Sequence, residues 1–113
     1  MKDAMLYAAD LGLRLDNPQQ ALDAMSCGVS GCIFTERDLH PEFFDLSNGL
    51  AGEVFQKFST YQFHAAFVIA DFEQLSPRVA ELALDHQNHP CVRLFGDVAE
   101  AEAWIKLLQQ QQQ

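Results

Sequence analysis

The fold is decided by the run FHAAFVIA at residues 63–70, the most apolar stretch of strand length in the chain. A continuous apolar run is typical of a strand that is buried on both faces of a sheet. Shorter runs at 29–35 and 91–95 lie on either side of it, and weaker ones occur at 5–8 and 11–15. We therefore expect about five strands.

Helix starts are marked by capping residues between these runs. They are the dipeptides Asn17-Pro18 and Ser76-Pro77, the capping-box pair Asp97 and Glu100, and the segment 47–49. The helix expected after the last of these carries Leu50, Val54, Phe58 and Tyr61 on one apolar stripe. The order β-β-α-β-α-β-α-β-α predicts a single α/β domain over residues 1–108 with a largely parallel sheet. The low-complexity glutamines 109–113 are expected to be the frayed end of the last helix.

Composition and charge limit the partners. The chain has 113 residues, 49% of them hydrophobic, which suits one folded domain. Sixteen acidic against seven basic residues give a net charge of -9, which repels nucleic acids and anionic membranes. No stretch approaches the roughly 18 apolar residues of a membrane span, and the first residues do not form a secretory signal. Cys27, Cys32 and Cys91 are too few for a disulfide framework, so a cytoplasmic protein is expected.

Polar and aromatic residues are densest in segment 35–53, which joins a buried strand to a helix. It should therefore lie at the carboxyl edge of the sheet, where open α/β sheets bind ligands. Ser47 and Asn48 suit a helix cap, and free amides at that helix start would accept an anion or a partner's carboxylate. The simpler alternative is an ordinary capped helix whose glycines, Gly49 and Gly52, let it pack close to the sheet.

Phe43 and Phe44 are neighbours in this segment and cannot both point into one core from a regular element. At least one is expected under the loop or on the surface, where an exposed aromatic would suit a protein partner or a second copy of the chain.

Two further patterns contain residue types that occur in metal and catalytic sites. His86, His89 and Cys91 form H-x-x-H-x-C, which lacks the further ligands of a structural zinc site, and His86 is expected to end a helix. Asp71 follows the central strand and would join Asp45 at the carboxyl edge, where two acids could hold magnesium. No phosphate-binding loop or nucleophile turn accompanies them, so no metal, cofactor or catalytic residue is predicted.

The block FFDLSNGLAGE at 43–53, followed by QKF at 56–58, resembles a small bacterial family named domain of unknown function 4180. The similarity runs from about Leu15 to Ile105, and its specific part is GLAGE-x-x-QKF. Members of that family carry a hydroxyl residue where this chain has Asn48. The resemblance implies kinship and no particular activity.

The element order and the turn DLSNGL at 45–50 also resemble STAS domains, the regulatory modules of anti-sigma-factor antagonists and sulfate transporters. Their D-S-S-G-L type turn opens a helix, and a partner kinase phosphorylates the serine before the glycine. Gly49 and Leu50 match that turn, Ser47 matches its first serine, and Asn48 stands at the phosphoacceptor position. The resemblance implies a regulatory module in which Ser47 is the candidate for modification, adding a charge of about -2 at a helix start.

The leading hypothesis is a bacterial, cytoplasmic interaction module without catalytic activity. Its expected contact residues are Phe43, Phe44, Asp45, Ser47, Asn48, Gly49 and Glu53, and its partner is another protein or a second copy. On this hypothesis Gly49→Val weakens binding more than folding. The alternative is a small-ligand or anion-binding protein, or a minor enzyme, with Asp45, Asp71 and Glu53 near a pocket at the same edge.

Overall fold

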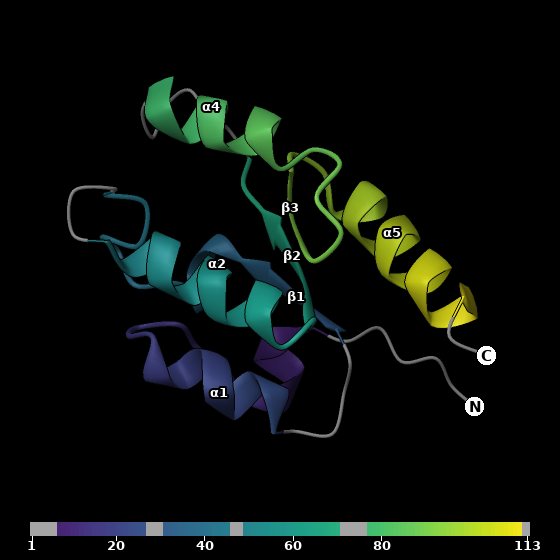
Figure 1. Cartoon of the computed structure of the whole chain (residues 1–113), viewed down its shortest axis with the longest axis horizontal. Coiled ribbons are helices and arrows are strands. Elements are labelled where there is room, and N and C mark those ends of the chain that lie inside the picture. Colours follow the sequence, from purple (N-terminus) through teal and green to yellow (C-terminus); the bar gives the residue numbers. More distant parts are fainter. Residues whose placement is uncertain (1–6, 27–30, 46–48, 71–76, 112–113) are drawn as a thin grey trace.

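Three parallel strands form one sheet, in the order β1-β2-β3 (Figure 1), within the residues that the computed structural model describes, which are 7–26, 31–45, 49–70 and 77–111. They are β1 (Gly31–Thr35), β2 (His64–Val68) and β3 (Val92–Phe95). In the register of the sheet, Ile33 lies opposite Ala66 and Phe67 lies opposite Leu94. The run 63–70 therefore forms the central strand.

The described part of the chain also contains four α-helices and two short 3-10 helices. They are α1 (Gln19–Met25), α2 (Leu50–Thr60), α4 (Pro77–Asp85), α5 (Val98–Gln111), η1 (Ala8–Leu11) and η2 (Glu36–Asp38). Each α-helix begins within or directly after its predicted capping segment. The Asn17 side chain accepts a hydrogen bond from the Gln20 amide at 3.2 Å, and Asp97 accepts one from the Ala99 amide at 2.8 Å. These bonds satisfy amides that a helix start leaves without partners.

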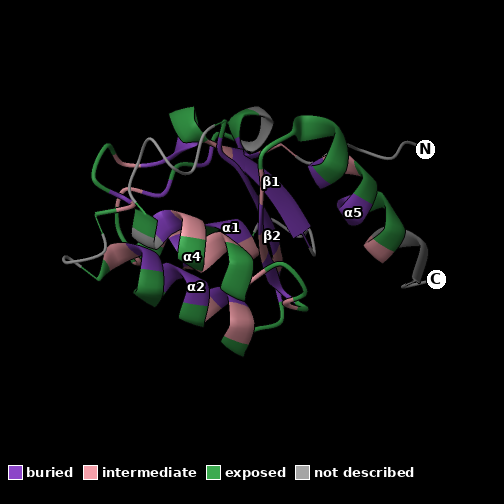
Figure 2. Cartoon of the chain, turned by 90° about the horizontal axis from the view of Figure 1, so that it is seen from above, coloured by how far each residue is buried: buried purple, intermediate pink, exposed green. Residues whose placement is uncertain are grey.

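The helices form a layer on each side of the sheet. Helices α1, α2 and α4 cover one face, and α5 lies on the other (Figure 2). Side chains of β2 alternate between the two, so that Phe67 enters the layer of three helices while Ala66 and Val68 face α5. Burial on both faces confirms the interpretation of the apolar runs.

The larger core is aromatic. The rings of Phe34, Phe43, Phe55 and Phe58 surround that of Phe67 at centroid distances of 5.1 to 6.4 Å. The smaller core lies under α5 and contains Ile33, Ala66, Val68, Ala101, Trp104 and Ile105.

The two weak strands predicted near the amino terminus differ from the structure. Residues Ala8–Leu11 form η1, because Gly12 at φ +70° closes a turn in which the Leu13 amide donates to the Ala8 carbonyl at 2.9 Å. Leu15 makes only an isolated bridge to Leu39, and Tyr7 makes one to Ile33. Among the described residues the sheet therefore has three strands, where about five were expected. Residues 5 and 6 lie outside the described part.

Candidate functional site

Segment 35–53 begins at the carboxyl end of β1 and ends in the first turn of α2, as the sequence predicted. It turns away from the sheet at a capping box, in which the Thr35 amide and hydroxyl both donate to the Asp38 carboxylate at 2.8 and 3.1 Å. Asp38 is a buried acidic side chain, 6% exposed. These bonds to a charged acceptor fix the direction in which the chain leaves β1.

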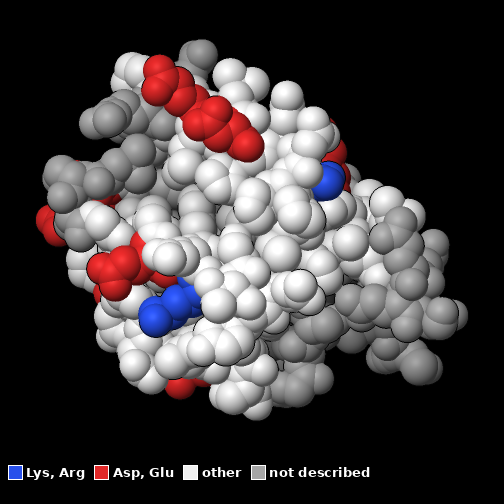
Figure 3. All heavy atoms as spheres, viewed as in Figure 1, with Lys and Arg blue, Asp and Glu red and all other residues white. Residues whose placement is uncertain are grey.

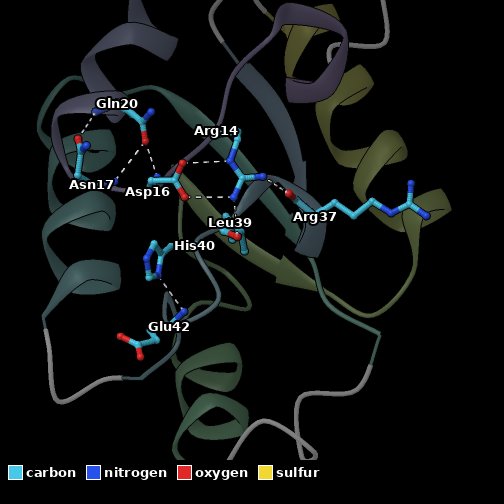
Figure 4. A network of polar contacts seen from close by, with 8 residues as sticks. All are labelled: Arg14, Asp16, Asn17, Gln20, Arg37, Leu39, His40 and Glu42. Atoms are coloured by element: carbon cyan, nitrogen blue, oxygen red, sulfur yellow. Dashed lines mark hydrogen bonds and ion pairs between the residues drawn. The ribbon is translucent and has the colours of Figure 1, made fainter.

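Arg14 ties the segment to the loop before α1 (Figure 4). Its guanidinium donates two hydrogen bonds to the Asp16 carboxylate, at 3.0 and 3.1 Å, and reaches the backbone carbonyls of Arg37 and Leu39. The paired hydrogen bonds raise the pKa of Arg14 and lower the pKa of Asp16. Sequence reasoning missed this clamp, because the two carbonyls lie far along the chain and no motif marks them.

The phenylalanine pair anchors the segment to the core. Phe43 is 1% exposed, and its ring lies 5.7 Å from that of Phe67 and 6.1 Å from that of Phe55. Phe44 is half-buried and meets Phe43 edge-on at 4.9 Å. Phe43 anchors the loop, which is one of the two places that the sequence predicted for this pair, and Phe44 keeps part of its surface accessible. The turn at 40–45 places both rings on the same core.

The other predicted contact residues in the described chain are exposed. Asp45 lies before the helix, Gly49 caps it, and Glu53 lies in its first turn, where a negative charge suits the helix dipole. Ser47 and Asn48 lie outside the described residues.

The two glycines at the start of α2 have different roles. Gly49 adopts φ +76°, a left-handed conformation that side chains with a Cβ rarely take. Gly52 lies inside the helix, and a Cβ built there would meet no atom within 4 Å. The alternative that both glycines pack the helix close to the sheet is therefore wrong. Gly49 permits the left-handed backbone conformation at the start of α2, whereas Gly52 permits no close packing within the described chain.

The solvent side of α2 continues this surface. Glu53, Gln56, Lys57, Thr60 and Tyr61 line a shallow hollow of about 290 Å³ along the helix. Tyr61 is 64% exposed, although its spacing predicted a place on the buried stripe. The helix ends at Thr60, so the chain turns before Tyr61 could reach the core.

A second hollow, of about 500 Å³, lies where all three strands end. Its lining residues are Thr35, Glu36, Arg37, Val68, Ala70, Gly96, Asp97 and Val98. Two of its carboxylates are already engaged, Glu36 with the Ala70 amide at 3.2 Å and Asp97 with the start of α5. Asp45 lines neither of these two hollows and Glu53 lines only the one along α2, so neither hollow brings these two acids together. Asp71, the third member of that prediction, is outside the described part.

The histidines of the H-x-x-H-x-C pattern have structural roles. His86 follows the last residue of α4, as predicted, and its ring contacts Phe55 at 5.4 Å. The Nδ1 atom of His89 accepts hydrogen bonds from the amides of Cys91 and Val92, both at 3.0 Å. His89 therefore holds the amino end of β3 in place.

Lowering the pH is expected to destabilise the protein through His89. Burial, with the neighbouring charges of His86 and Arg93, lowers the pKa of His89 below its ordinary value of 6.5. The unfolded chain therefore takes up the proton first, and the free energy of unfolding falls as the pH drops from above 6.5 towards 5.5. Protonation also removes the acceptor of two backbone hydrogen bonds, each worth about 1 kcal/mol.

Urea unfolding at pH 7.5 and 5.5 at constant ionic strength measures this effect. The matched variant is His89→Asn, whose amide oxygen can accept the same hydrogen bonds but does not titrate. Its unfolding free energy should change less between the two pH values than that of the unsubstituted chain. An equal change in both proteins would contradict the role given to His89.

No group of three or more His, Cys, Asp or Glu side chains within the described residues is placed to hold a metal ion. Cys32 and Cys91 are buried, and burial raises the pKa of the Cys91 thiol; Cys27 is not among the residues described. None of the helices in the described ranges is long and apolar enough to cross a membrane.

Comparison with known proteins gives one match. The family model described as Domain of unknown function (DUF4180) matches residues 3–105, a span that includes the whole of segment 35–53. No curated protein and no solved structure matches the chain. The match covers the sheet and α1, α2 and α4, together with most of α5, so the chain belongs to the DUF4180 family.

Proposed function

We propose that this chain is a regulatory protein-interaction module without catalytic activity, working in the bacterial cytoplasm, and that it binds its partner through the start and solvent side of α2. The observation that carries the proposal is Gly52. A glycine inside a helix costs about 1 kcal/mol relative to alanine. No atom of the described residues lies close to a Cβ built at Gly52, so packing among these residues does not require this cost. A partner backbone that packs directly on the helix at this position would require a residue without a side chain there, which explains the glycine.

The neighbouring residues suit such a contact. Glu53 and Gln56 are exposed on the same side of α2, and Tyr61 presents a large amphipathic ring at its end. Tyrosine is enriched in protein interfaces because it adds contact area and a hydrogen-bonding group together. Figure 3 shows this face of the molecule, with acidic groups gathered along α4 and charges of both signs over α2. Phe43 supports the surface from beneath by fixing the chain that enters the helix.

The proposed fold relationship is to STAS domains, with Ser47 as the residue whose phosphorylation would regulate binding. Its support is the strand and helix order after Gly31 and the sequence DLSNGL at residues 45–50. The isolated bridge between Tyr7 and Ile33 also lies at the side of β1 where a further strand would pair. A phosphate of charge about -2 near the start of α2 would change the affinity for a partner by local electrostatics.

The variant Gly52→Arg is expected to weaken partner binding at least tenfold while the protein stays folded, because the long side chain occupies the surface on which the partner packs. The partner is captured from a lysate of the source cells, identified by mass spectrometry, purified, and titrated with each variant by calorimetry. The matched control is Leu84→Arg, which adds the same charge at an exposed position of α4, 64% accessible.

Unchanged affinity of Gly52→Arg would refute the proposed surface. Loss of binding in Leu84→Arg alone would place the interface on α4 instead. In the unsubstituted protein, a phosphoryl group mapped to Ser47 would support the regulatory part of the proposal.

A second candidate function rests on the 500 Å³ hollow at the strand ends, whose size suits a small ligand. Arg37 is the basic residue of its lining and would face an anionic group. Native mass spectrometry of protein from its own host, followed by denaturation, tests it. A small molecule that is lost on denaturation, and is absent from Val98→Trp in which the hollow is filled, would favour this function over the interaction module.

A further inference from the structure

Helix α5 presents a row of apolar side chains to solvent. Its inner side packs Ala101, Trp104 and Ile105 on the sheet, and no other described helix covers that face (Figures 1 and 2). Its outer side carries Ala99, Ala103 and Leu107, all exposed, with Leu107 at 50%. Residues four apart lie along one side of a helix, so these three form an apolar stripe, which is here named the α5 stripe.

The solvent sides of isolated surface helices are usually charged or polar. On α2 the corresponding positions are Gly52, Gln56 and Thr60, none of them a large apolar residue. A single exposed leucine also occurs on α4, at Leu84, but on α5 the leucine continues a row of two exposed alanines, and covering this row would remove apolar surface from water.

We propose that the α5 stripe is a homodimer interface, on which a second copy of this chain packs its own α5 antiparallel about a two-fold axis beside Ala103. The pattern is complementary to itself. In an antiparallel pair centred on Ala103, Leu107 of one copy lies level with Ala99 of the other, so a large side chain meets a small one at both ends. The small residue at the axis lets the helices approach closely. A two-fold pair requires such matching, because each copy offers the same surface.

Charge complementarity supports a second copy of the chain as the partner that covers the α5 stripe. By helical geometry, Lys106 of one copy lies on the same flank as Glu102 of the other, within about one helical turn. Glu102 is held in place by the hydroxyl of Tyr7. The arrangement therefore brings opposite charges together twice, once for each copy.

The net charge of -9 on each chain works against association. Salt screens this repulsion, while the apolar contact does not depend on it. A single helix face is also a small interface, in the range of weak complexes. We therefore expect a dissociation constant on the order of 100 μM, and tighter association at higher ionic strength.

Sedimentation equilibrium at protein concentrations from about 10 μM to 1 mM, in low salt and in about 0.5 M NaCl, tests the proposal. The expected mass rises toward that of a dimer, and more so in high salt. Ala103→Arg should weaken association at least tenfold, whereas Gln19→Arg, with the same charge change at an exposed position of α1, should not. A monomer at every concentration, or equal dissociation constants for Ala103→Arg and the unsubstituted chain, would overturn the proposal.

Cysteine cross-linking tests the arrangement. Two helices in contact bring the Cα atoms of Ala103 and its symmetry mate within reach of a disulfide, whereas those of Ala99 lie about 12 Å apart along the helix axis. Under mild oxidation, Ala103→Cys should form a covalent dimer faster than Ala99→Cys, with the unsubstituted chain and its own cysteines as background. Equal rates for the two variants would exclude the antiparallel pair.

Discussion

The variant Phe67→Ala is expected to lose about 3–5 kcal/mol of unfolding free energy, a large part of what stabilises a domain of this size. Phe67 is fully buried in the central strand, and its ring contacts four others. Removing it leaves a cavity that rings held on separate elements cannot close. The anchor of segment 35–53 is lost as well, because Phe43 stacks on the same ring.

Urea unfolding followed by far-ultraviolet circular dichroism measures the loss. The matched control is Phe44→Ala, whose ring is half-buried and should cost about 1–2 kcal/mol. The single tryptophan, Trp104, lies in the smaller core on the other side of the sheet, so its fluorescence reports whether α5 remains docked. A Phe67→Ala variant as stable as Phe44→Ala would show that Phe67 is not the centre of the core.

The variant Gly49→Val is expected to lose about 2 kcal/mol of unfolding free energy, because valine must adopt the left-handed conformation that Gly49 holds at φ +76°. The sequence-based hypothesis expected this change to affect binding more than folding. The backbone conformation predicts a loss of stability, so Gly49→Val cannot distinguish the two effects.

The control for this prediction lies three residues further along the helix. Gly52→Ala places a Cβ in open space and should raise the unfolding free energy by about 0.5–1 kcal/mol. Thermal unfolding of Gly49→Val, Gly52→Ala and the unsubstituted chain measures both changes in stability. A destabilised Gly52→Ala would mean that Gly52 is needed by the fold, and would remove the main support for the proposed partner surface.

Much of the fold could be predicted because its signals are local. The capping residues before α1, α2, α4 and α5 act within one helical turn, and each is followed by a helix in the structure. The run 63–70 predicts a central strand because no other arrangement buries so many apolar side chains in succession. The place of segment 35–53 at the carboxyl edge follows from the strand and helix on either side of it.

The parts that could not be predicted depend on contacts between distant residues. The Arg14 clamp needs carbonyls beyond β1, and the burial of Phe43 depends on the rings of Phe55 and Phe67. Tyr61 is exposed because α2 ends one residue before it, and helix ends are poorly marked where no glycine follows. The open space beside Gly52 depends on where neighbouring elements lie, which no local pattern records.

The parallel sheet also has a consequence for how the chain reaches this structure. Each strand pairs with a segment about thirty residues away, and no hairpin joins neighbouring strands. Loops of that length must close before any ladder hydrogen bond can form, so the conformational search is dominated by non-local contacts. We expect the helices to form early and the sheet to assemble late. Folding should therefore be slower than that of a helical bundle of the same length.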